Sequence, residues 1–157
     1  MKKIIYVFVL LIGIVLLTGC GEEKNIKTLK CTLNQKVNGQ FGSMVTEETV
    51  TYNEDIQEFE KLHYRLNVDL TDEKAIEDSK KKEALASLKT SLEGVCEEAL
   101  QKGADSCTVT TPREYSIEIN SEGDVESGTI DQAVANYTTI EEMRTHFEGL
   151  HYTCKEE

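Results

Sequence analysis

The sequence predicts an α+β fold, in which an antiparallel β-meander and a later hairpin form one sheet, a long helix packs across one face and a short helix lies near the C-terminus. Two patterns lead to this expectation. Apolar and polar residues alternate in several segments separated by short turn sequences, as they do in half-buried strands. In one long and one short segment apolar residues instead recur every three or four positions, as in amphipathic helices. Strands and helices grouped in this way are typical of α+β folds.

Three strands are expected first. Residues 27–35 alternate, and the Asn-Gly pair at 38–39 is a strong hairpin signal. Residues 41–52 are rich in Thr and Val and form the returning strand. After a turn at 53–55, residues 62–70 show the clearest alternation in the chain. Short turns between successive strands predict a meander.

A long helix is expected next. Thr71 is the predicted N-cap, and the helix runs from about residue 72 to 101 before Gly103 ends it. The apolar stripe of this helix is formed by Leu85, Leu88, Leu92, Val95, Cys96 and Ala99. The side opposite the stripe is expected to face solvent and carries Lys80–Glu83.

A second hairpin is expected after the long helix. Residues 107–111 and 115–119 alternate, and the Thr-Pro-Arg sequence at 111–113 forms the turn. Residues 121–128 are acidic and contain Gly, which favours a loop, and residues 130–137 fit neither pattern.

The C-terminal part predicts a short capped helix. Thr139 and Glu142 have the spacing of a capping box, and Gly149 ends the helix. Ile140, Met143 and Phe147 share one side of it. Residues 150–154 then form a short extended tail.

The first 19 residues have the form of a signal peptide. Two lysines precede an apolar run at 4–17, which is shorter than the roughly 20 residues of a spanning helix. The run ends in Leu17-Thr18-Gly19-Cys20, the pattern of a bacterial lipobox. The alternatives are an ordinary signal peptide with a chance Cys, or an uncleaved short anchor.

The lipobox predicts where the protein is located. The Cys20 thiol takes a diacylglyceryl thioether, and its two acyl chains meet the condition for stable membrane attachment. Residues 20–26 are then a lipidated tether, and residues 27–157 are a single extracytoplasmic domain on the cell membrane.

The charge excludes some partners. With 17 Lys and Arg against 29 Asp and Glu, the chain has a formal net charge of −12. Nucleic-acid binding needs clustered Lys and Arg, so nucleic acid is excluded as a partner. The acidic surface also argues against attraction to anionic lipid.

Four cysteines remain beside Cys20. In an exported domain an even number indicates disulfides. Of the three possible pairings we favour Cys96–Cys107 and Cys31–Cys154, because the first pair flanks a helix-turn-strand segment and the second ties the first strand to the C-terminus. A zinc site and free thiols are the alternatives, but the close ligand pairs of structural zinc are missing.

The sequence assigns no residue to catalysis, a cofactor or a metal. His63, His146 and His151 are expected to be surface or partly buried histidines. The sequence holds no nucleophile elbow, P-loop, GxGxxG or HExxH motif. A cluster of acidic residues loosely suggests a calcium site, but it lacks the ligand spacing of an EF-hand. It comprises Glu122, Asp124, Glu126 and Asp131.

Several features together resemble the YehR-like small bacterial lipoproteins. They are the lipobox, Leu29-Lys30-Cys31, the strands with Tyr52 and Tyr64, and Gly149-Leu150-His151-Tyr152-Thr153-Cys154. The resemblance covers most of the chain after Cys20 and implies an α+β fold and a surface-anchored location. That family has no established activity, so the resemblance implies no catalytic or binding residue. The four-cysteine framework is not general to the family.

We therefore expect a membrane-anchored lipoprotein acting as a non-enzymatic binding or interaction module for an envelope protein or ligand. The alternative is a small-ligand or metal-binding lipoprotein associated with a transporter, and an envelope enzyme comes third. An interaction module needs an exposed apolar patch or a free sheet edge. A receptor needs a deep cleft, and an enzyme needs convergent titratable groups in a pocket.

Overall fold

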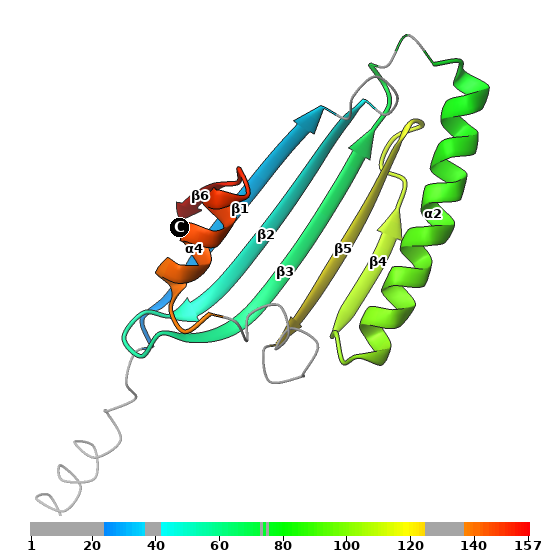
Figure 1. Ribbon diagram of the computed structural model, residues 1–157. Helices are drawn as coiled ribbons and strands as arrows, with labels where there is room; N and C mark the ends of the chain where they lie inside the picture. Colours follow the sequence, from blue (N-terminus) through cyan, green and yellow to red (C-terminus); the bar gives the residue numbers. More distant parts are fainter. Residues whose placement is uncertain (1–23, 37–41, 73, 75, 125–136) are drawn as a thin grey trace, which may run out of the picture.

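The computed structural model describes residues 24–36, 42–72, 74, 76–124 and 137–157. These residues form one antiparallel sheet of six strands, in the order β4-β5-β3-β2-β1-β6, and two helices (Figure 1). The predicted α+β fold, with its meander, long helix, hairpin and short C-terminal helix, is confirmed. The elements are β1 (Ile26–Lys36), β2 (Ser43–Asn53), β3 (Glu58–Asp69), α2 (Asp78–Gln101), β4 (Ser106–Thr110), β5 (Ser116–Asp124), α4 (Ile140–Gly149) and β6 (Thr153–Glu156).

The first three strands form the predicted meander. β1 pairs with β2, and β2 pairs with β3, both antiparallel. Between β2 and β3 the Asn53 side chain accepts the backbone N–H of Asp55 at 3.1 Å, which closes the expected turn. β3 begins at Glu58, four residues before the predicted start. The Asn-Gly pair at 38–39 lies outside the described residues.

The second hairpin joins the meander beside β3. β5 pairs with β4 on one side and with β3 on the other. The expectation of a loop from residue 121 is wrong for residues 121–124, which continue β5. There Gly123 lies opposite Leu62 of β3, and pairing with β3 along residues 121–124 and with β4 at residues 121 and 122 supplies backbone partners despite the low strand propensity of Gly. Residues 125–128 are not among those described.

The long helix begins later than the sequence predicts. Thr71 is not its N-cap, because the Thr71 N–H donates to the Asp69 carboxylate at 2.8 Å. The N–H of Leu70 donates to the carbonyl of Tyr115 at 2.8 Å, so the chain is still bound to the sheet there. The helix starts at Asp78 behind Glu77, which makes no side-chain cap bond. Its end before Gly103, at φ 100°, is as predicted.

One lysine of α2 lies on the apolar stripe. Lys81 was expected on the solvated side, but it is only 5% exposed. It precedes buried Leu85 by four residues, so its stem packs against the sheet, and its Nζ lies 5.0 Å from the centre of the Tyr115 ring. Val95, assigned to the stripe, lies at its margin and is 53% exposed.

The C-terminal helix and tail hold the other end of the sheet. The Thr139 hydroxyl accepts the N–H of Glu142 at 3.2 Å, as the capping box predicts. Met143 of α4 is fully buried on the side of the helix that faces the sheet. The predicted tail forms β6, which pairs with β1 from residue 153 onward.

Two disulfides connect these elements in the predicted pairing. Cys31 of β1 bonds to Cys154 of β6, and Cys96 of α2 bonds to Cys107 of β4. The two cysteines of the first disulfide are 123 residues apart in the sequence, and those of the second are 11 residues apart.

The apolar core has two separate parts, both on the sheet face that carries the helices. α4 packs on β1 and β6, and α2 packs on β4 and β5 (Figure 1). The first core centres on Leu29, Val50 and Met143, and the second on Leu92 and Ile117. The two helices thus cover the two ends of the sheet, and the middle strands β2 and β3 lie between them.

Candidate functional site

The residues singled out from the sequence do not converge on a reactive centre. Cys20 lies outside the described residues. His63 is half-buried on β3, whereas His146 and His151 are exposed. Among the residues with described positions, no three His, Cys, Asp or Glu side chains are grouped to hold a metal ion. No helix in the described part has the length and apolar character to cross a membrane.

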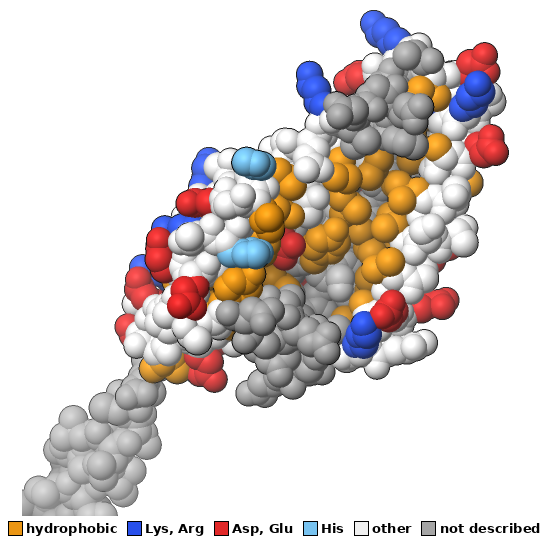
Figure 2. Space-filling model, viewed as in Figure 1, with side chains coloured by type: hydrophobic (Ala, Val, Ile, Leu, Met, Phe, Trp, Pro, Cys, Tyr) orange, Lys and Arg blue, Asp and Glu red, His pale blue; other side chains and the backbone are white. Residues whose placement is uncertain are grey.

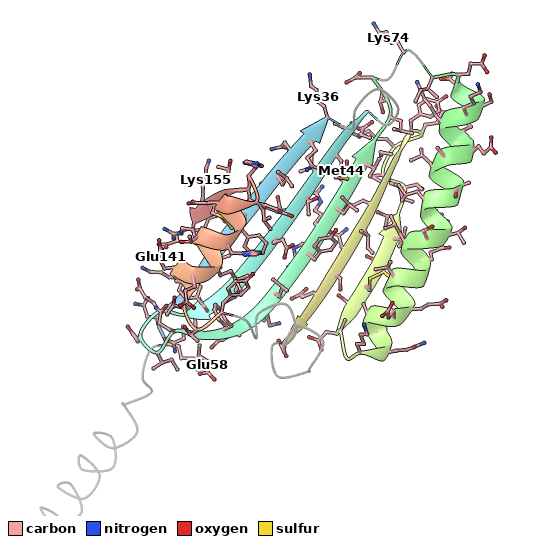
Figure 3. All side chains as sticks on the ribbon, viewed as in Figure 1. Lys36, Met44, Glu58, Lys74, Glu141 and Lys155 are labelled. Carbon is pink, nitrogen blue, oxygen red and sulfur yellow. A yellow bond between two sulfur atoms is a disulfide. The ribbon has the colours of Figure 1, made fainter. Side chains whose placement is uncertain are left out.

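The helix-bearing face has an apolar surface between α4 and α2, which we call the inter-helix surface. Its side chains come from β2, β3, β4 and α2, border the second core, and are partly rather than fully buried. Figure 2 shows a recessed apolar surface between the two helices, and Met44 lies between them in Figure 3. The inter-helix surface comprises Met44, Glu48, Tyr64, Leu66, Leu88 and Val109.

A carboxyl group lies in the floor of this surface. The strand register places Glu48 opposite Tyr64 on one side and opposite the disulfide-bonded Cys31 on the other. Alternation along β2 puts Glu48 on the same face as Val50, which is fully buried. Glu48 is itself half-buried, and this burial raises the pKa of its carboxyl group.

Three tyrosines lie near Glu48, one opposite it on β3 and two packed against the first core. Burial first, and then the negative charge of Glu48, raise the pKa of Tyr64, of Tyr137 and of Tyr152. Tyr152 follows α4, and Tyr137 precedes it and contacts His146, with ring centres 5.4 Å apart and the ring planes tilted by 54°. The four side chains therefore form one aromatic and acidic cluster at the α4 side of the inter-helix surface.

Glu48 has no charged partner in the described structure. Neither a hydrogen bond nor an ion pair joins its carboxylate to any residue with a described position. Its sequence neighbour Glu47, on the opposite face, differs in this respect, because it pairs with Lys30 at 3.0 Å. A carboxylate that has lost water without gaining a cation is energetically costly.

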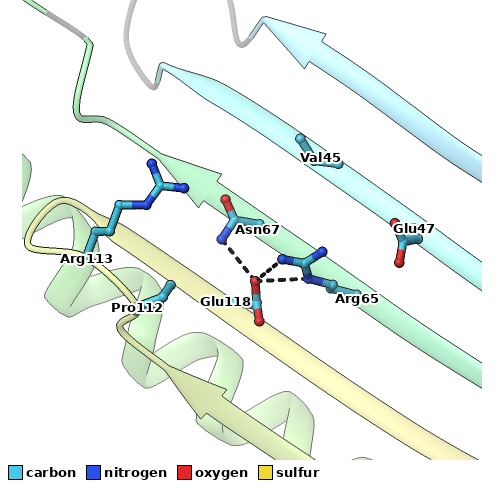
Figure 4. Close-up of a pocket in the computed structure, with 7 residues that line it drawn as sticks. All are labelled: Val45, Glu47, Arg65, Asn67, Pro112, Arg113 and Glu118. Carbon is cyan, nitrogen blue, oxygen red and sulfur yellow. Dashed lines mark hydrogen bonds and ion pairs between the residues drawn. The ribbon is translucent and has the colours of Figure 1, made fainter.

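The opposite face of the sheet carries a second candidate, a polar pocket of about 270 Å³ (Figure 4). In its centre Glu118 accepts hydrogen bonds from Arg65, at 2.6 and 2.9 Å, and from Asn67 at 3.2 Å. The bond from Arg65 is the main reason that the pKa of Glu118 is lowered. The pocket is lined by Val45, Glu47, Arg65, Asn67, Pro112, Arg113 and Glu118.

The charges of this polar pocket are paired within the chain. Besides the Arg65–Glu118 pair, Arg113 lies 2.8 Å from Asp69, and Glu47 is paired with Lys30. A ligand would have to displace these partners. The pocket therefore has the character of a structural ion-pair network across neighbouring strands.

The sheet edges offer little for strand addition. β6 pairs with residues 29–32 of β1, which leaves residues 33–36 without a partner strand on that side among the described positions. This stretch is mostly exposed and ends in Lys36, and short charged edges of this kind resist pairing. The other edge strand, β4, is bound to α2 through the Cys96–Cys107 disulfide.

Comparison with known proteins gives little beyond the structure itself. The sequence matches no protein-family model and shows no significant similarity to a curated protein. Among solved structures, the chain is similar to the NMR structure of a protein from Streptococcus pneumoniae TIGR4, with 15% identity, coverage of 83% of this chain and 76% of that chain, and a TM-score of 0.45. The resemblance to YehR-like lipoproteins stays a prediction.

Glu48 was not singled out from the sequence, although a signal for it was present. Residues 44–52 alternate, and Glu48 is in phase with Val50 and Tyr52, both of which are buried. A Glu on the apolar side of a strand is unusual. What the sequence could not show is that three tyrosines from β3 and from both ends of α4 gather around it.

Proposed function

We propose that this protein is a membrane-anchored extracytoplasmic lipoprotein that binds a partner protein through the inter-helix surface. The observation that carries the proposal is the split core. α2 and α4 each cover one end of the sheet, and partly buried apolar side chains of β2 and β3 lie between them. Recessed apolar surface with a polar group inside it is typical of a binding site.

The lipobox that ends at Cys20 supports the anchor. The fold adds a limit on the distance between this anchor and the sheet. β1 begins at Ile26, six residues after Cys20. An extended chain spans at most about 3.5 Å per residue, so the lipid anchor and the first strand are separated by no more than about 21 Å. The partner is therefore expected at the membrane surface.

The alternative of a metal-binding or small-ligand lipoprotein has less support. The described residues contain no grouped metal ligands, and the polar pocket has its charges paired internally. At the inter-helix surface, by contrast, exposed apolar area and a carboxylate without an ion pair to a described residue occur together.

The anchoring part of the proposal predicts that Cys20→Ala releases the protein from the membrane. Without the thiol no thioether can form, and the two acyl chains that hold the mature domain are lost. Membrane and soluble fractions of cells expressing wild type and variant are compared by immunoblotting. An unprocessed variant that stays in the membrane would show that residues 1–19 are themselves the anchor.

The binding part is tested with two threonine variants on opposite faces. Leu66→Thr removes apolar area from the inter-helix surface, whereas Val45→Thr makes a similar change in the lining of the polar pocket. Full-length protein is isolated from solubilised envelope with its bound partner. We expect Leu66→Thr to lower partner recovery severalfold and Val45→Thr to leave it unchanged, and the reverse order would assign binding to the polar face.

A further inference from the structure

We propose that Glu48, Tyr64, Tyr137 and Tyr152 bind the ammonium group of a lysine side chain that a partner protein inserts into the inter-helix surface. The inference rests on the proposed function and names the chemistry of the partner. It is carried by the position of Glu48 on an apolar surface, opposite Tyr64 of β3 and opposite Cys31 of the core on which Tyr137 and Tyr152 pack, with no ion pair to a described cation.

None of the described Lys or Arg side chains forms an ion pair with Glu48. Each hydrogen bond and ion pair of the described Lys and Arg side chains that the structure shows goes to another group. The internal segments outside the described residues, which are 37–41, 73, 75 and 125–136, contain no Lys, Arg or His. The His146 ring contacts that of Tyr137, and His146 makes no ion pair with Glu48. A cation that neutralises Glu48 in the mature domain would therefore come from outside.

The surroundings fit an ammonium group. A carboxylate attracts it directly, and the faces of tyrosine rings attract it through their quadrupoles. A bare metal ion is a poorer fit, because it needs several anionic or imidazole ligands. The apolar stem of lysine would lie along Leu66 and Met44.

The protein already contains such an arrangement elsewhere. Lys81 is 5% exposed, with its Nζ 5.0 Å from the centre of the Tyr115 ring and 3.4 Å from the Asp78 carboxylate. A lysine held between a tyrosine and a carboxylate is thus compatible with this sheet face. At Glu48 the carboxylate and the tyrosines are present, and the lysine is the missing member.

The test uses n-butylammonium as a mimic of the lysine side chain and 1-butanol as its uncharged counterpart. Binding to the full-length protein in detergent is followed by saturation-transfer NMR at about pH 8, where n-butylammonium is charged. The variants are Glu48→Gln and, as a matched control, Glu47→Gln on the adjacent strand position of the opposite face. Circular dichroism checks that both variants are folded.

We expect n-butylammonium to bind wild type and Glu47→Gln alike, and Glu48→Gln about tenfold more weakly, because one charge-assisted contact is lost. Tyr64→Leu is expected to weaken binding less. Equal binding of 1-butanol and n-butylammonium, or equal binding to wild type and Glu48→Gln, would overturn the lysine site. If Glu48→Gln still recovers the same partner as wild type while Leu66→Thr does not, only the lysine site fails and the proposed function stands.

Discussion

Glu48 is a costly residue for the folded protein. Its carboxyl group is half-buried on the apolar face, and its pKa is raised by that burial. Lys81, another charged side chain packed on this face, is compensated by Tyr115 and Asp78. A charge retained without such compensation is often functional, since structure alone gives no reason for it.

Glu48→Gln is therefore predicted to stabilise the free protein. A carboxyl group with a raised pKa in the folded state favours folding below its unfolded pKa, and this contribution is lost as the pH rises through the folded pKa. The free energy of unfolding of the variant should equal that of wild type near pH 4 and exceed it by about 1 kcal/mol at pH 8. Urea denaturation across this range measures the difference.

Glu47→Gln is the control for this prediction. Glu47 is paired with Lys30, so its replacement brings no comparable gain at high pH. A Glu48→Gln protein that is less stable than wild type at pH 8 would mean that the carboxylate has a stabilising partner after all.

Among the elements, those with a regular pattern were predictable. Alternation located the first and third strands of the meander, Thr and Val content located the second, and the Thr139 cap located α4. The start of α2 was missed because two contacts keep the chain at the sheet. Leu70 donates to the Tyr115 carbonyl, which is distant in sequence, and the Thr71 N–H donates to the Asp69 side chain, which keeps Thr71 from acting as the cap. The continuation of β5 was missed because pairing with two neighbours cannot be read from residues 121–124 alone.

The two disulfides hold elements over very different loop lengths, which predicts different effects on stability. Removing Cys31–Cys154 by a double alanine variant should cost about 5 kcal/mol, and removing Cys96–Cys107 about 3 kcal/mol, because the longer loop restricts the unfolded chain more. Urea denaturation of the two double variants gives the order. A larger loss for Cys96–Cys107 would show that anchoring α2 to β4 matters more than chain entropy.

The whole molecule has two unlike faces. One face of the sheet carries paired charges, such as Arg65–Glu118 and Lys30–Glu47. The other carries two apolar cores under the helices and the inter-helix surface between them. The sequence predicted the fold and the disulfides but not this division, because alternation assigns a residue to a face without telling which helix, if any, covers it.

The most direct test of partner binding at the inter-helix surface is site-specific photo-crosslinking in living cells. A photoreactive amino acid is placed at Met44 in one variant and at Val45 in another. These neighbours on β2 face opposite sides of the sheet, toward the inter-helix surface and the polar pocket. We predict a discrete crosslinked product from position 44 and none from position 45. A product from position 45 alone would contradict the account and place binding on the polar face.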